Sequence, residues 1–178
     1  MRRCVIGNRL SAAEIERAFE ALDRELGRRG VRGEVFVVGG AVLCLAFQAR
    51  TATKDVDAWF APATEVREAA AAVAASLDLP EDWLNDGAKA FLPQAPVFER
   101  WKSWENLEVS VAEARTLLAM KCAAARTVED TGDIRFLAGV LGLRTAEEIL
   151  NVVLSFYPAE RLPVRTRLLL EEVVGEGG

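Results

Sequence analysis

The chain has 178 residues, of which 51% are hydrophobic and 28% are charged, so it can bury a sizeable core and is not expected to be disordered. It contains no histidine, which excludes Ser-His-Asp triads, Cys-His pairs, histidine-based zinc sites and histidine general acid–base catalysis. Its formal net charge of −5 counts against a large non-specific nucleic-acid interface. Phosphoryl or nucleotidyl transfer needs only carboxylates, basic groups and a metal, and fits these limits.

A reduced, cytoplasmic protein with no membrane association is expected. No apolar run approaches the roughly 20 residues that a membrane-spanning helix needs, and the N-terminal segment lacks the apolar core of a signal peptide. The three cysteines are odd in number and widely spaced, so they form neither a disulfide framework nor a metal knuckle. They are Cys4, Cys44 and Cys122.

The first predicted element is a structural helix over residues 12–29. Ser11 and Glu14 have the spacing of a capping box, in which each side chain bonds the backbone N–H of the other residue. Apolar residues then recur at helical spacing up to Leu26, and Gly30 follows. This helix is expected to cover a sheet.

Residues 35–47 predict a strand, a glycine turn and a short helix. Residues 35–38 are apolar and mostly β-branched, which is typical of a buried strand. Gly39 and Gly40 follow directly and precede an apolar run of about two helical turns. Glycines at such a turn let the backbone approach a ligand, and helical N–H groups attract anions, so both glycines are candidates for nucleotide binding. The alternative is a tight turn without a ligand.

A second strand carries two carboxylates. Asp55 and Asp57 flank Val56, and alternate strand residues share a face, so both carboxylates point the same way. Neighbouring carboxylates repel each other unless a cation lies between them, and Mg²⁺ prefers oxygen ligands. Both are therefore candidate ligands of Mg²⁺ or Mn²⁺, with a solvated strand face as the alternative. The preceding loop offers further candidates for phosphate contacts: Arg50, Thr51, Thr53 and Lys54.

Residues 62–113 predict one helix, one loop and two strands. An alanine-rich helix begins near Pro62 and ends before Pro80. The loop over 80–96 contains Trp83, which is expected to pin it to the core, with stacking on a ligand as the alternative. Lys89 in this loop is a further candidate for a phosphate contact. Two short strands over residues 97–113 follow.

The next helix, over about residues 113–127, carries an inward-facing lysine. Lys121 lies on the apolar stripe, four residues after Leu117. A buried lysine is costly unless it meets an anion, which a triphosphate or the Asp55/Asp57 pair would supply. The alternative is a lysine at the edge of the stripe whose ammonium group reaches solvent.

Two aspartates open the following helix. Asp133 leans inward, four residues before Leu137. The alternative gives Asp130 the N-cap and Asp133 a place in the first turn, where a carboxylate favours the helix dipole. Further helices, one of them capped by Thr145, complete a C-terminal helical extension.

The order strand, Gly39-Gly40, helix, Asp55-x-Asp57 resembles the minimal, DNA-polymerase-β-like nucleotidyltransferases. The form GGAVLCLAFQARTATKDVD, with the later LLAMK and DTGDI segments, is most similar to bacterial AbiEii-type toxins and related nucleotidyltransferase-like proteins. The resemblance implies an α+β fold with a small mixed sheet flanked by helices over residues 1–112. A helical part over residues 113–178 would pack on it.

The resemblance also implies a reaction and roles. An NMP would pass from an NTP to a hydroxyl of tRNA or of a protein, with Asp55 and Asp57 holding the metal. Glu108 would be the third metal carboxylate, by its strand position, with an exposed strand glutamate as the alternative. Lys121 would contact nucleotide phosphate, and Asp130 or Asp133 would act late, as a base for the acceptor. The biological context would be a toxin–antitoxin or phage-defence pair with a cognate antitoxin.

Two other classes of function stay open. One is a binding module of the same fold that holds nucleotide or a partner without turnover. The other is metal-assisted phosphoester hydrolysis, which would release phosphate or cut strands instead of forming an adduct.

Overall fold

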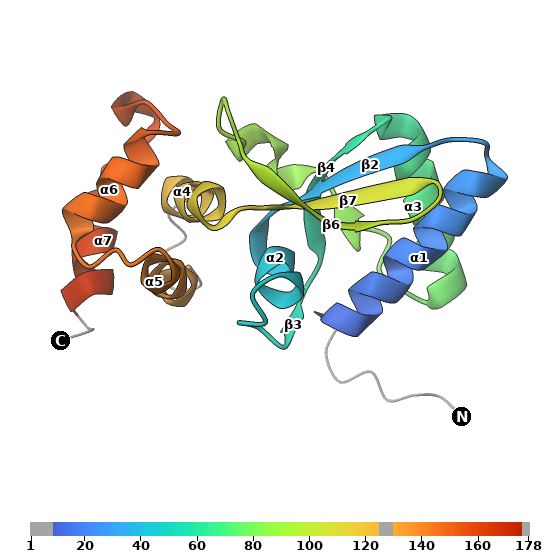
Figure 1. Cartoon of the computed structure of the whole chain (residues 1–178), viewed down its shortest axis with the longest axis horizontal. Coiled ribbons are helices and arrows are strands. Elements are labelled where there is room, and N and C mark those ends of the chain that lie inside the picture. The colour runs from blue at the N-terminus through green and yellow to red at the C-terminus, as the bar shows by residue number, and fades with distance from the viewer. Residues whose placement is uncertain (1–8, 125–129, 176–178) are drawn as a thin grey trace. The chain divides into compact units, whose positions relative to one another are not determined.

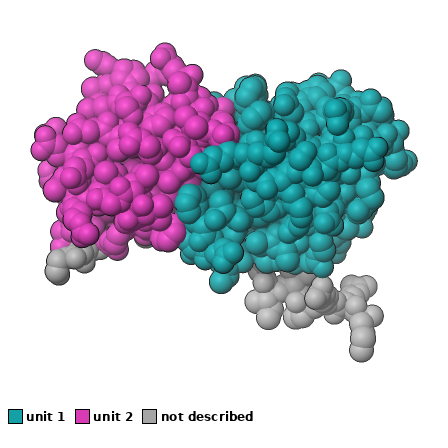
Figure 2. All heavy atoms as spheres, in the orientation of Figure 1, with its two compact units in different colours: residues 1–89, 99–111 teal, residues 90–98, 112–178 magenta. Residues whose placement is uncertain are grey.

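The computed structural model describes residues 9–124 and 130–175 (Figure 1). The chain divides into two compact units, residues 1–89 with 99–111 and residues 90–98 with 112–178 (Figure 2). The first unit is built on a mixed five-stranded sheet and the second is helical. The expectation of a mixed α+β fold is therefore confirmed.

The sheet of the first unit has the strand order β5-β4-β2-β7-β6. Its central strand, β2, runs antiparallel to β4 and parallel to β7, while β4 and β5 are parallel. The two predicted strands within residues 97–113 are β6 and β7. The strand bounds are β2 Gly33–Val37, β4 Val56–Ala61, β5 Leu84–Asn85, β6 Phe98–Ser103 and β7 Leu107–Ala112.

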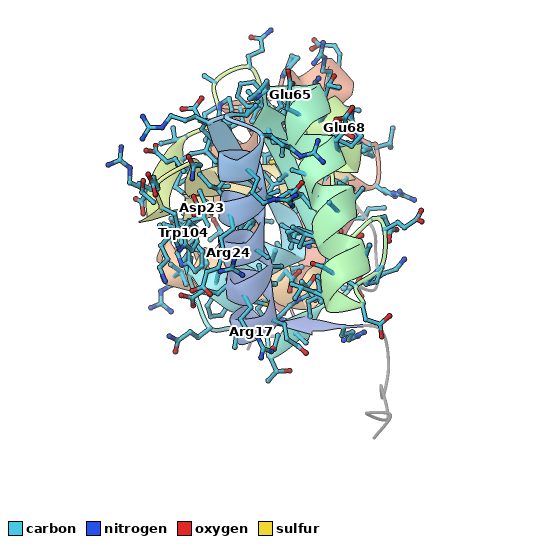
Figure 3. The ribbon with its side chains drawn as sticks, turned by 90° about the vertical axis from the view of Figure 1, so that its right-hand side faces the viewer. Arg17, Asp23, Arg24, Glu65, Glu68 and Trp104 are labelled. Atoms are coloured by element: carbon cyan, nitrogen blue, oxygen red, sulfur yellow. The ribbon has the colours of Figure 1, made fainter. Side chains whose placement is uncertain are left out.

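Two helices, α1 (Ala12–Arg28) and α3 (Ala63–Leu77), lie side by side over one face of this sheet (Figure 3). The strand residues that point toward them are buried: Val35, Val37, Val56, Ala58, Phe60 and Val109. At Gly33 a Cβ would lie 2.9 Å from Leu26 Cδ1 and 3.2 Å from Val66 Cγ2, so the helices pack too closely here for a larger side chain. The predicted capping box is present, since Ser11 and Glu14 exchange hydrogen bonds.

Trp83 fixes the chain between α3 and β5 to the core. Its side chain is fully buried, its indole N–H donates to the Ala70 carbonyl at 3.0 Å, and its ring meets that of Phe19 edge-on at 5.8 Å. The pinning role is confirmed, and the alternative of an exposed stacking residue is wrong. The segment was expected to be mostly loop with one helical turn, and the turn is present as a 3₁₀ helix, η1 (Gly87–Phe91). The short strand β5 was not indicated by the sequence pattern.

A short helix and a two-stranded ladder shape the region between β2 and β4. Helix α2 (Gly39–Leu45) begins at the two glycines. Strand β3 (Ala52–Thr53) then pairs antiparallel with β1 (Leu10–Ser11). This ladder anchors the basic, hydroxyl-rich loop to the start of α1.

The second unit contains α4 (Ala114–Ala124), α5 (Thr131–Val140), α6 (Ala146–Leu154), η2 (Ala159–Arg161) and α7 (Thr166–Gly175). Helix α4 contacts α5 and α6, and α7 contacts the same two helices. The last residues of the helix expected over 113–127 lie outside the described residues. The predicted cap at Thr145 is present, with Glu148 completing a capping box. Across residues 9–124 and 130–175, no helix is long and apolar enough to cross a membrane.

Candidate functional site

The first predicted glycine and the second predicted carboxylate meet in the first unit. The β2–β4 ladder extends past Val37, because the Val38 backbone N–H donates to the Asp57 carbonyl at 2.9 Å. Gly39 follows with φ +68°, a conformation that glycine adopts without strain. A Cβ at Gly39 would lie 3.0 Å from Asp57 Oδ2. The carboxylate therefore lies directly against the glycine backbone where α2 begins.

Gly40 meets two of the predicted phosphate-binding side chains. A Cβ there would lie 2.9 Å from Thr53 Oγ1 and 3.3 Å from Arg50 Nη1. Thr53 is buried and held by the β1–β3 ladder, whereas Arg50 is half-buried. A guanidinium, a hydroxyl and a carboxylate thus surround two consecutive glycines. Such a set offers donors to an anion and an acceptor to a cation.

Asp55 lies at the entrance to β4, just before its first residue. Its Oδ2 accepts a hydrogen bond from Asn85 Nδ2 at 3.3 Å, and Asn85 belongs to β5, the parallel neighbour of β4. Asp55 and Asp57 are both half-buried, while Val56 between them is buried. The alternation matches the prediction that the two carboxylates share the accessible side. Asn85 was not predicted, because no pattern marks a strand of two residues.

The donor set fits a divalent cation that also binds a substrate. Mg²⁺ in nucleotide sites is usually held by one or two carboxylates together with waters and substrate phosphates, and not by a cage of protein ligands. Within the described part of the chain, no cluster of three or more His, Cys, Asp or Glu side chains is placed to hold a metal. Asp55 and Asp57 match in number the one or two carboxylates that the first kind of site uses.

The other candidates for phosphate contacts in this unit lie at its surface. Thr51 and Lys54 are exposed in the loop around β3, on either side of the buried Thr53. Lys89 is exposed in η1. No contact places any of the three against Gly39, Gly40 or the carboxylates, so they stay predictions as phosphate-binding residues.

Glu108 is not brought together with the Asp55/Asp57 pair. The sheet register aligns Glu108 with Glu34, and Glu34 with Ala61, four residues beyond Asp57 on β4. Four strand residues span roughly 13 Å. Glu108 instead forms an ion pair with Arg100 at 3.1 Å. The choice of Glu108 as the third metal ligand is therefore not supported, although the residue lies on the same face of the sheet.

The second unit holds a buried ionic cluster of Lys121, Asp130 and Asp133. The lysine ammonium lies 2.6 Å from Asp130 Oδ1 and 2.8 Å from Asp133 Oδ2, and only 13% of the lysine side chain is exposed. Asp130 occupies the N-cap position of α5, but its side chain makes no capping hydrogen bond and contacts the lysine. The sequence predicted an inward lysine that needs an anion, and named a triphosphate or the Asp55/Asp57 pair. Within this unit the anions that meet Lys121 are Asp130 and Asp133 instead.

Cys122 lies beside this cluster in α4. Burial, and secondarily the charge of Asp130, raises the pKa of its thiol to about 12. The thiol is therefore protonated at neutral pH and is no candidate for a nucleophile.

Comparisons of the chain with models of known protein families, with curated proteins and with solved structures found no match.

Proposed function

We propose that the protein is a metal-dependent nucleotidyltransferase, which moves a nucleoside monophosphate from an NTP to an acceptor hydroxyl. The observation that supports this most is the contact between Gly39 and the Asp57 carboxylate. It joins the glycine turn and the Asp-x-Asp strand, which lie about 15 residues apart in the chain, into one local group. In the resembling nucleotidyltransferases these two motifs form the reaction centre.

Asp55 and Asp57 would hold Mg²⁺ or Mn²⁺. The ion, when bound, supplies positive charge against the phosphates and the departing pyrophosphate. Asn85 orients the Asp55 carboxylate through its amide hydrogen bond, and the Gly39 backbone limits the positions open to the Asp57 carboxylate. These contacts would hold the two carboxylates in position before a ligand binds.

Arg50, Thr53 and Gly40 would bind the phosphates. Arg50 and Thr53 reach the same glycine, so a phosphate placed there meets a guanidinium and a hydroxyl together. Thr51 and Lys54, exposed beside Thr53, would add contacts at the outer end of the triphosphate. By resemblance the acceptor is a tRNA or protein hydroxyl, and the context a toxin–antitoxin or phage-defence pair with a cognate antitoxin.

A second candidate is a binding module of the same type that holds nucleotide without transferring it. Two observations favour it over an enzyme. The strand register places Glu108 four residues along the sheet from Asp57, so no residue is assigned as the third metal-binding carboxylate. The charge of Lys121, expected to neutralise phosphate, is compensated by Asp130 and Asp133 in its own unit.

A transfer assay separates these candidates. The protein is incubated with each α-labelled NTP in turn, together with total tRNA, in Mg²⁺ or in EDTA. The proposal predicts label on the RNA or on the protein in Mg²⁺ and none in EDTA. Nucleotide binding without a labelled product would favour the binding module. Release of labelled monophosphate would indicate hydrolysis. Absence of both binding and transfer would refute the proposal.

A further inference from the structure

The face of the sheet opposite α1 and α3 carries an aromatic pair next to the candidate site. Helices α1 and α3 cover one face of β2 and β4, so the alternate side chains lie on the other face. On β4 these are Asp57, Trp59 and Ala61. On β2 they are Glu34 and Phe36. Trp59 is therefore the next side chain after Asp57 on the same face of the same strand.

The Trp59 ring is both exposed and supported. It stacks on Phe36, its direct partner in the ladder, with ring centroids 5.0 Å apart and planes at 23°. Even so, 39% of the tryptophan remains exposed. The stacked neighbour restricts the indole from one side and leaves ring surface available to a ligand. Large aromatic side chains with accessible surface are typical stacking platforms for bases.

The position of the ring suits the base of a nucleotide bound at the glycine turn. Trp59 lies two positions after Asp57 along β4, which corresponds to roughly 6.6 Å. A nucleotide places its base and its phosphates at opposite ends of the sugar, so it can reach both positions at once. Glu34 is exposed farther along the same face, where its charge disfavours a polyanionic strand. This charge favours a single nucleotide over a nucleic-acid chain.

We propose that Trp59 stacks on the base of the NTP whose phosphates bind at the Gly39-Gly40 turn, beside the carboxylates that would hold the metal. The inference rests on the proposed nucleotide site and adds to it the residue that holds the base. Because every base offers a ring face, stacking on Trp59 binds all four bases and selects little among them. The protein is then a nucleotide-binding protein with broad base tolerance at this position.

The test compares NTPs with inorganic tripolyphosphate, which has phosphates but no base. Binding of each to wild type, Trp59→Leu and Trp59→Phe is measured by calorimetry in Mg²⁺. Trp59→Leu is expected to weaken NTP binding by about tenfold or more and to leave tripolyphosphate binding unchanged. Trp59→Phe, which keeps an aromatic ring, should bind NTP nearly as the wild type does. NTP should also quench tryptophan fluorescence in the wild type and in Trp101→Phe, but not in Trp59→Phe. Trp101 is a matched control because it lies in β6 with its ring centroid 6.3 Å from that of Phe19 in α1.

The outcomes separate the two proposals. If the wild type binds NTP and Trp59→Leu binds it equally well, the stacking inference is overturned and the nucleotide site survives. If Trp59→Leu loses affinity for NTP and for tripolyphosphate to the same degree, Trp59 supports the phosphate site or the fold. The stacking inference is then overturned as well. If the wild type binds neither, both proposals fail.

Discussion

Replacing Lys121 by methionine is expected to lower the free energy of unfolding by about 3–5 kcal/mol. The ammonium group lies within 3 Å of two buried carboxylates, and the cluster as a whole carries one excess negative charge. Removing the lysine charge leaves Asp130 and Asp133 close to each other without this cation. Removing one partner of a buried ion pair lowers the free energy of unfolding by more than the intact pair adds to it, because the remaining buried charge cannot regain its hydration. Urea unfolding followed by far-UV circular dichroism measures the loss.

Lys102→Met is the matched control for this change. Lys102 pairs with Glu16, but both side chains are considerably exposed, and an exposed ion pair contributes about 0–1 kcal/mol. A loss of the same size in both variants would contradict the account of a buried cluster. A third result is informative as well. Unchanged stability of Lys121→Met with weakened NTP binding would assign the lysine to phosphate, as the resemblance implied.

Replacing Gly39 by alanine is expected to weaken Mg²⁺-dependent NTP binding by about 10–100-fold. The new Cβ would lie 3.0 Å from Asp57 Oδ2 and would force the carboxylate to move. The left-handed backbone at φ +68° would add a cost of about 1–2 kcal/mol to folding. Thermal unfolding and calorimetric titration with NTP measure the two effects separately.

Gly30→Ala provides the matched control. Gly30 has φ +67°, nearly the same as Gly39, but a Cβ there would meet no atom within 4 Å. The two variants should therefore lose similar stability, and only Gly39→Ala should lose NTP affinity. Equal NTP binding by both variants would show that the close approach of Gly39 to Asp57 has no role in nucleotide binding.

The parts of the fold that depend on local pattern could be predicted from the sequence. The capping box at Ser11 and the apolar spacing that follows give the bounds of α1 to within one residue, because caps and helical periodicity act within a few turns. The alternation of side chains along a strand likewise predicted that Asp55 and Asp57 lie on the same, accessible side. Their approach to the glycine turn needs only the pairing of two neighbouring strands, which the order of the motifs already suggested.

The parts that depend on register or on helix packing could not be predicted. Glu108 lies on the same face of the sheet as Asp57. Its position along the sheet depends on the register between the parallel strands β2 and β7, and the alternation of side chains does not determine that register. Asn85 reaches Asp55 through a strand of two residues, too short for any periodicity. The partners of Lys121 depend on how α4 and α5 pack, so the sequence indicated that an anion was needed but pointed to a triphosphate or the Asp55/Asp57 pair, and not to Asp130 and Asp133.

The most direct test of the central claim is nucleotidyl transfer by Asp57→Asn beside Glu108→Gln. Both variants exchange a carboxylate for an amide of the same shape on the same face of one sheet, but only Asp57 lies at the glycine turn. The account predicts that Asp57→Asn lowers transfer in Mg²⁺ by more than about 100-fold, while Glu108→Gln keeps it near the wild-type level. Wild-type rates in a folded Asp57→Asn variant, or equal losses in both variants, would contradict it.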